Sequence, residues 1–206
     1  MDYLWKDGLV GKNTKTEEVF LTIEKNYKSN KDAPSKYVEN LWGKYSGLRI
    51  TKNNSLNGNM FEAIVKTALY KAGIHPFFPQ AKLQFVPNID FDIILFPKDD
   101  NGFVDVSAPI CLSLKTSLRE RYKQADLEGI ALKNVYKRAQ TYLVTMDEAD
   151  EIQSVKDKIS DKDIIGIDDV IDAKSTDFDA IINDLQTRGV GIPPSIDVMV
   201  SKAKVK

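Results

Sequence analysis

The stretch over residues 109–128 joins an apolar strand pattern that ends in a lysine to a segment rich in charged side chains. Side chains alternate along a strand, so Leu112 and Leu114 share one face while Ser113 and Lys115 share the other. A charged amine among apolar strand residues is costly to bury without an anionic partner. The fold must therefore bring an acidic side chain to Lys115 or leave the lysine at the surface.

A second strand pattern, over residues 89–96, offers such an acidic partner. Asp90 and Asp92 lie two positions apart and share a face of this strand. If the strands over 89–96 and 109–116 pair with these faces aligned, Lys115 lies beside Asp90 or Asp92, and alternation alone does not choose between them. An acidic residue at a strand start often only caps a turn, and a lysine at a strand end often reaches solvent. Only the combination points to chemistry.

The periodicity of the whole chain predicts a mixed α/β sandwich, in which helices flank a central sheet. Apolar residues at helical spacing or in strand-like runs define the elements, and turn residues separate them. Helices are expected over 14–28, 36–46, 58–72 and 176–188, and from Leu118 onward. Strands are expected over 82–86, 89–96, 109–116 and 141–145, and within 163–172.

Two helix starts carry capping signals. The polar segment over 52–59 is predicted to be a turn-rich loop, and Asn57 or Asn59 could cap the helix that follows it. Ser117 and Glu120 form the S-x-x-E capping pattern, which predicts a helix that begins near Leu118.

Length and composition fit one globular domain. The chain has 206 residues, of which 42% are hydrophobic, so we expect a single domain over 1–206 with a substantial core. Within it we distinguish an N-terminal helical segment (1–56), a core (57–145) and a C-terminal strand–helix part (146–206). Cys111 is the only cysteine, which excludes an intrachain disulfide and a cysteine zinc site.

The charge and the hydropathy limit partners and location. A net charge of -1 gives no global support for nucleic-acid binding, so any basic surface must be local. No apolar run approaches the roughly 20 residues that a membrane span needs. The first residues lack the pattern of a secretory signal. We therefore expect a soluble, cytoplasmic protein that does not engage a membrane.

The two strands and the helix before them resemble the PD-(D/E)xK nuclease superfamily, in particular type II restriction endonucleases. That pattern is an Asp on one strand, often after a proline, then an acidic residue, any residue and Lys on the next strand. PNIDFD supplies Pro87 and both aspartates, and residues 113–115 read Ser-Leu-Lys. The similarity covers about residues 57–145 and begins with a helix that carries Glu62. It implies a restriction-endonuclease-like central mixed sheet flanked by helices.

Ser113 departs from this pattern, because Glu or Asp is usual at its position. The chain is similar to a subgroup of restriction enzymes whose strand reads Ser/Thr-x-Lys and whose missing carboxylate comes from the next helix. Glu128 lies thirteen positions after Lys115 and fits that role. Asp92 directly precedes the apolar run IILF, as the family's metal ligand tends to do, so the resemblance favours it over Asp90.

The resemblance implies a Mg²⁺-dependent enzyme that hydrolyses double-stranded DNA and leaves 5′-phosphate ends. Asp92, Glu128 and Asp90 are the candidate metal ligands, Lys115 the catalytic lysine and Glu62 an outer ligand. A symmetric homodimer would bring one site to each strand of the duplex. Six further residues are candidates for contacts with DNA phosphates or base edges: Arg119, Arg121, Lys123, Asn57, Asn59 and Lys52. Without such a role, they would simply lie on a solvated helix face or in an ordinary turn.

Three other interpretations stay open. A nuclease of the same fold could act on DNA structure, as in repair, and not on a fixed sequence. A non-catalytic DNA-binding module could keep the nuclease core, which Ser113 favours and which Lys115 and Glu128 oppose. An unrelated α/β domain could carry these charges only as surface pairs. That last interpretation predicts an exposed Lys115 far from Asp90 and Asp92.

Overall fold

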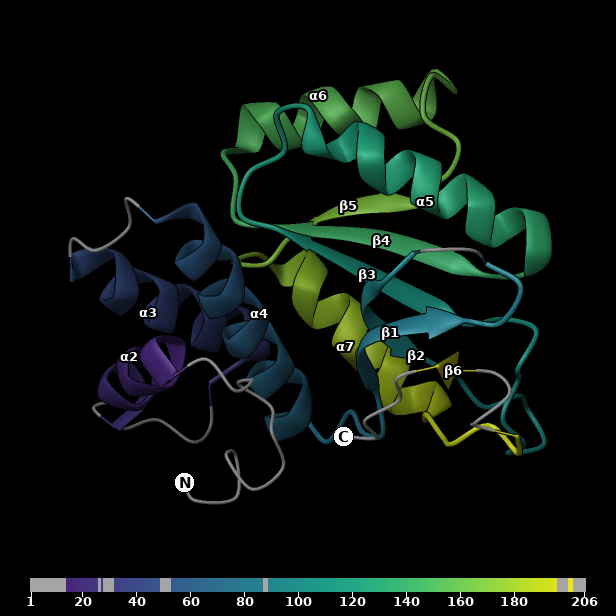
Figure 1. Cartoon of the computed structure of the whole chain (residues 1–206), viewed down its shortest axis with the longest axis horizontal. Helices are drawn as coiled ribbons and strands as arrows, with labels where there is room; N and C mark the ends of the chain where they lie inside the picture. Colours follow the sequence, from purple (N-terminus) through teal and green to yellow (C-terminus); the bar gives the residue numbers. More distant parts are fainter. Residues whose placement is uncertain are drawn as a thin grey trace.

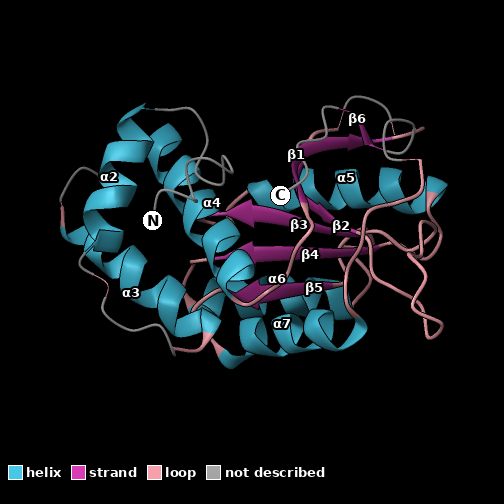
Figure 2. Cartoon of the chain, turned by 90° about the horizontal axis from the view of Figure 1, so that it is seen from below, coloured by secondary structure: helices cyan, strands magenta, loops and turns pink. Residues whose placement is uncertain are grey.

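A computed structural model describes residues 14–25, 27, 32–48, 53–86, 89–195 and 200–201 (Figure 1). Its centre is a sheet in the strand order β5-β4-β3-β2-β1-β6, whose strands lie side by side in Figure 2. The strands are β1 (Phe78–Leu83), β2 (Phe91–Leu95), β3 (Ile110–Lys115), β4 (Gln140–Thr145), β5 (Asp169–Asp172) and the two-residue β6 (Val200–Ser201).

The sheet is mixed. β1, β2 and β3 pair antiparallel, whereas β3, β4 and β5 run parallel. In the β2–β3 pair Ile93 stands opposite Leu112. Continuing this register places Asp92 opposite Ser113, two positions before the end of β3 at Lys115. The predicted pairing of the two strand patterns is therefore confirmed.

Six helices are found in the described part of the chain: α2 (Thr14–Lys25), α3 (Pro34–Gly47), α4 (Asn54–Lys71), α5 (Arg121–Val135), α6 (Ala149–Ser160) and α7 (Thr176–Arg188). α2, α3 and α4 gather at one end of the sheet, where β3 and β4 also end (Figures 1 and 2). The helical bundle therefore meets the strand ends that carry the polar residues.

Strand alternation assigns a helical layer to each face of the sheet. Val144 and Ile171 pack into a core with α4 and α7, whereas their neighbours Leu143 and Val170 pack into a second core with α5 and α6. Both faces of the central strands are thus buried, as parallel strands require. The predicted mixed α/β architecture, a central sheet flanked by helices, is confirmed.

The start of α4 differs from the prediction. Asn53 caps the helix by accepting a hydrogen bond from the Leu56 N–H at 3.0 Å, so residues from Asn54 onward are helical. The predicted loop over 52–59 and the caps at Asn57 or Asn59 are therefore wrong. Asn57 instead accepts a hydrogen bond from the Tyr45 hydroxyl at 2.7 Å, which ties α4 to α3.

The start of α5 also differs. The Leu118 side chain is buried and its N–H donates to Asp147 at 2.6 Å, so this residue belongs to an anchored loop. The helix begins at Arg121, and the Glu120 side chain makes no capping hydrogen bond. The predicted S-x-x-E cap is therefore wrong, because Arg119 has a φ angle of +29°, which interrupts the helix that Ser117 would have capped.

Two further elements depart from the sequence prediction. α6 was not expected, although its Ile152 and Val155 are buried against the sheet. β1 begins at Phe78, earlier than the expected strand over 82–86, and it includes Pro79. No helix in the described residues is long and apolar enough to cross a membrane.

Candidate functional site

The two paired strands bring Lys115 to Asp92. The Lys115 Nζ atom donates to Asp92 Oδ2 at 3.1 Å, and the backbone N–H of Leu114 donates to the same oxygen at 2.7 Å. The two charged side chains are only 16% and 15% exposed, respectively. The interpretation that required an exposed Lys115 far from both aspartates is therefore wrong.

Asp90 lies apart from this pair. It precedes β2, its side chain is 42% exposed, and its carboxylate faces Lys82 at 3.9 Å. The choice that alternation left open is thus settled geometrically, because the structure brings Asp92, and not Asp90, to Lys115.

Glu62 reaches the site from α4. Its Oε2 atom accepts hydrogen bonds from Lys66 Nζ at 3.4 Å and from Gln80 Nε2 at 3.1 Å. The same Gln80 nitrogen donates to Asp92 Oδ1 at 3.2 Å, so one amide group connects both carboxylates. Burial raises the pKa of the Glu62 carboxyl, Lys66 lowers it, and the negative charge of Asp92 raises it.

Glu128 reaches the same region from α5, where Gln124 donates a hydrogen bond to its Oε1 atom at 2.7 Å. Burial raises the pKa of the Glu128 carboxyl, and the charges of Lys115 and Asp92 act on it with opposite signs. Lys115 and Asp92 therefore lie within electrostatic range of the Glu128 carboxyl. The structure thus brings side chains from α4, β2 and β3 into contact, and Glu128 of α5 lies within electrostatic range of two of them.

The other carboxylates of α5 are engaged elsewhere. Asp126 accepts hydrogen bonds from the N–H groups of Ile165 (3.0 Å) and Gly166 (2.6 Å), which fastens α5 to the loop after α6. Glu120 is 80% exposed and forms an ion pair with Lys123. Glu128, two positions after Asp126, points to a different side of the helix.

Ser113 lies at the position opposite Asp92 and is only 7% exposed. Its Oγ atom is buried and has no hydrogen-bond partner in the structure. A buried hydroxyl without a partner is uncommon and calls for an explanation, such as an ion or a water molecule.

The residues predicted to contact DNA form no single group. Arg119 and Arg121 are exposed near the start of α5, and Lys123 is exposed and paired with Glu120. Asn57 is bonded to Tyr45, and Asn59 lies on α4. Lys52 lies outside the described residues, and so does Pro87.

The donor set fits a hard cation such as Mg²⁺. Glu62, Asp92 and Glu128 supply carboxylate oxygens, and Ser113 adds an unpartnered hydroxyl. Oxygen atoms are the ligands that Mg²⁺ takes in proteins, usually from one or two carboxylates. In the described residues, no three His, Cys, Asp or Glu side chains are already close enough to enclose an ion. The oxygen atoms of these residues are thus not gathered into a metal-binding cluster in this structure.

Two residues of this site were missed in the sequence. Lys66 follows Glu62 by four positions on a helix, a spacing that could have revealed it. Gln80 gave no signal, because it stands next to Pro79 in a segment that resembles a connector.

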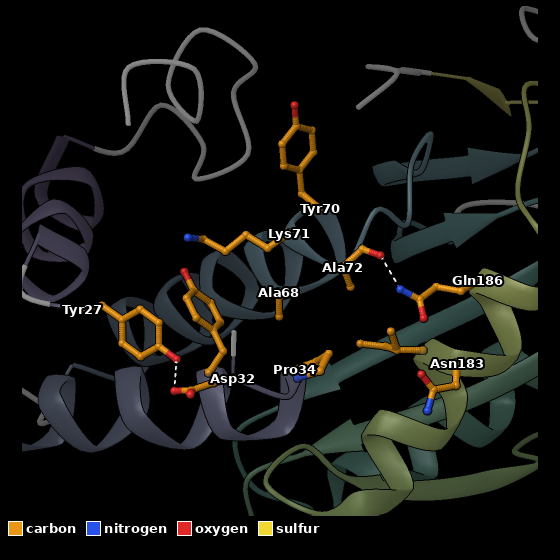
Figure 3. A pocket seen from close by; sticks show the side chains of 11 residues that line it. Tyr27, Asp32, Pro34, Ala68, Tyr70, Lys71, Ala72, Asn183 and Gln186 are labelled. Carbon is orange, nitrogen blue, oxygen red and sulfur yellow. Dashed lines mark hydrogen bonds between the residues drawn. The ribbon is translucent and has the colours of Figure 1, made fainter. Parts of the chain in front are cut away.

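A cavity of about 550 Å³ lies elsewhere, between α3, the end of α4 and α7 (Figure 3). Tyr27, Tyr37 and Tyr70 contribute to its wall, and Gln186 donates to the Ala72 carbonyl at its rim. None of the candidate site residues lines it. This cavity is therefore separate from the contact between Lys115 and Asp92.

No family model and no curated protein matches the chain. Among solved structures, it is similar to the restriction endonuclease PspGI in complex with substrate DNA. The TM-score is 0.52 at 19% sequence identity, over 90% of this chain and 84% of the other. At this identity the similarity shows the fold alone. The chain has a restriction-endonuclease-like fold.

Proposed function

We propose that the chain is a type II site-specific endodeoxyribonuclease, which hydrolyses phosphodiester bonds of double-stranded DNA with Mg²⁺ and leaves 5′-phosphate ends. The observation that carries this proposal is the buried contact between Lys115 and Asp92 on adjacent strands. Gln80 links Glu62 to Asp92, and Glu128 lies within electrostatic range of the pair. The restriction-endonuclease-like fold supports it.

The carboxylates would hold the cation. Asp92 and Glu128 are the proposed inner ligands, and Glu62 would act from the outer side, next to Asp92. A divalent cation held there supplies positive charge to the scissile phosphate and acidifies the attacking water. Ser113 lacks the carboxylate expected at its position, so Glu128 would replace it from α5.

Lys115 would stabilise the negative charge that develops in the transition state. Its amine is held by Asp92 at the end of β3, with few free rotamers left, because the side chain is largely buried. A charged donor fixed before the reaction needs little reorganisation, which makes such a group effective. It would also orient the attacking water by hydrogen bonding.

Arg119 and Arg121 would bind phosphates of the DNA backbone. Both side chains are exposed next to the first turn of α5, where free N–H groups of the helix also favour anions. Cutting both strands of a duplex needs two sites, so we propose a symmetric homodimer. Sedimentation of the protein with and without DNA would establish its oligomeric state.

Digestion of a large, sequence-diverse DNA with and without Mg²⁺ tests the proposal. Discrete Mg²⁺-dependent fragments would support it, and sequencing of their ends would give the recognition site and the 5′-phosphate. A Mg²⁺-dependent smear would indicate a nuclease of the same fold that acts on DNA structure. Retarded but uncut DNA in a gel would contradict catalysis and indicate a binding module. A substitution of Lys115 should abolish the fragments. Lys137→Ala, a change at an exposed lysine beyond the end of α5, is its control and should leave them unchanged.

A further inference from the structure

Gln80 links the carboxylates of Glu62 and Asp92. It lies in β1 between the pairs Pro79–Ile93 and Ala81–Phe91, so its position is opposite Asp92. Its Nε2 atom lies 3.1 Å from Glu62 Oε2 and 3.2 Å from Asp92 Oδ1. One NH₂ group carries two hydrogens, so it can serve one carboxylate with each.

These two hydrogen bonds counteract the electrostatic repulsion between the carboxylates of Glu62 and Asp92. Glu62 comes from α4 and Asp92 from β2, and no backbone hydrogen bond between these elements fixes the distance between their side chains. Two carboxylates at one place repel each other and tend to separate in the absence of a cation. The Gln80 amide donates to both, and Lys66 donates to the same Glu62 oxygen at 3.4 Å. Glu62 Oε2 and Asp92 Oδ2 each accept two hydrogen bonds, so the lone pairs left for an ion are those of Glu62 Oε1 and one on Asp92 Oδ1.

The backbone of Gln80 is unusual for a strand. Its φ angle is +49°, in the left-handed region that residues other than glycine rarely adopt. Strained backbone persists where the surroundings enforce it, and such residues cluster at functional sites. A glycine would adopt this angle freely but would provide no amide. The conformation therefore suits a side chain that is needed at this place.

We infer that Gln80 is a positioning residue, which holds Glu62 against Asp92 and so pre-assembles the carboxylates for a divalent cation. The inference rests on the proposed function for its consequence in catalysis. Its direct consequence is an affinity for the cation, which can be measured without DNA.

The test is calorimetric titration of the full chain with Mn²⁺, a spectroscopically and thermodynamically convenient substitute for Mg²⁺. Gln80→Met keeps the length of the side chain and removes the amide, and we expect it to weaken Mn²⁺ binding roughly tenfold to a hundredfold. Gln153→Met is the matched control, since Gln153 donates only to Asp157 on the surface of α6. This control should bind Mn²⁺ as the wild type does.

Gln80→Gly separates positioning from folding. It removes the amide and also the strain, so Mn²⁺ affinity should fall as in Gln80→Met while the melting temperature stays equal or rises. A residue with a merely structural role would lose affinity and melting temperature together. In cleavage assays, excess Mg²⁺ should recover much of the rate of Gln80→Met, with an unchanged KM for DNA.

The possible outcomes separate this inference from the proposed function. If Gln80→Met binds Mn²⁺ as tightly as the wild type does, the inference is overturned, whether or not the protein cuts DNA. If the wild type binds no Mn²⁺, the inference and the metal-dependent mechanism both fall. If the wild type binds Mn²⁺ through Gln80 but cuts no DNA, the inference stands and the nuclease proposal fails.

Discussion

The amine of Lys115 contacts Asp92 Oδ2 at 3.1 Å across two antiparallel strands, with both side chains largely buried. A partly buried charge pair in an apolar sheet is no general device of stability, because desolvation offsets most of the attraction. Its position near the strand ends, where Gln80 links Asp92 to Glu62, is instead what the proposed reaction with a phosphodiester would use.

Substitution of the two aspartates should give unequal results. Asp92→Asn should lower the cleavage rate roughly 100-fold or more, because it removes a ligand charge and the partner of Lys115. Asp90→Asn should keep most of the activity, because Asp90 faces Lys82 and not Lys115. Single-turnover cleavage rates at saturating Mg²⁺ check this, and equal losses in both variants would contradict the assignment of Asp92.

The proposed role of Glu128 on α5 has a control at Glu120, the residue that precedes this helix. Glu128→Gln should reduce cleavage roughly 100-fold, whereas Glu120→Gln should leave it nearly unchanged, because Glu120 is exposed and paired with Lys123. Melting temperatures should stay close to the wild-type value in both. A large loss in Glu120→Gln with an active Glu128→Gln would overturn the idea that α5 supplies its carboxylate at position 128.

The contact between α5 and the loop after α6 predicts a stability effect. A Cβ atom at Gly129 would overlap the backbone of Gly166, so Gly129→Ala must displace the helix that carries Glu128. We expect a loss of about 3 kcal/mol or more in the free energy of unfolding. Gly43→Ala is the matched control, since nothing lies within 4 Å of its Cβ and a helical alanine gains roughly 0.5–1 kcal/mol. Urea denaturation measures both, and similar stabilities would contradict the close packing.

The raised pKa values of Glu62 and Glu128 predict two opposite dependences on pH. Both carboxyls become protonated at a higher pH than an ordinary Glu, so cation binding should fall on mild acidification. The folding stability of the metal-free protein should change with pH in the opposite direction. A carboxyl whose pKa is raised by folding contributes stability below its unfolded pKa, and this contribution is lost as the pH rises through its folded pKa.

The double variant Glu62→Gln/Glu128→Gln should lack this part of the pH dependence of stability. Melting temperatures of the metal-free wild type and the double variant, followed from about pH 4 to 8, provide the comparison. Parallel curves for the two proteins would show that neither carboxyl has the expected shift.

The sequence predicted the elements with the clearest apolar patterns. β2, β3 and β4 are short, largely apolar runs buried in the sheet, and α7 carries apolar residues at helical spacing. The errors arise where tertiary contacts override a local signal. Asp147, distant in sequence, takes the N–H of Leu118, and Arg119 has a positive φ angle, so α5 begins only at Arg121. β1 includes Pro79, which suggested a connector. Among the described residues β6 pairs with Lys82 and Leu83 of β1 and not with Pro79, so the proline is tolerated there.

The part of the candidate site that lies on the paired strands β2 and β3 could be predicted from the sequence. Alternation placed Lys115 beside an aspartate, but only the register of β2 and β3 chose Asp92 over Asp90. Gln80 could not be found in the sequence, because its amide matters only where α4 and β2 meet in space.

The rate at which Lys115→Met cleaves DNA tests the central claim most directly. Under single-turnover conditions with saturating Mg²⁺, the account predicts a rate at least roughly 100-fold below that of the wild type, with DNA affinity and melting temperature nearly retained. A variant that cleaves DNA at the wild-type rate would contradict the claim that Lys115 and Asp92 form the centre of a nuclease site.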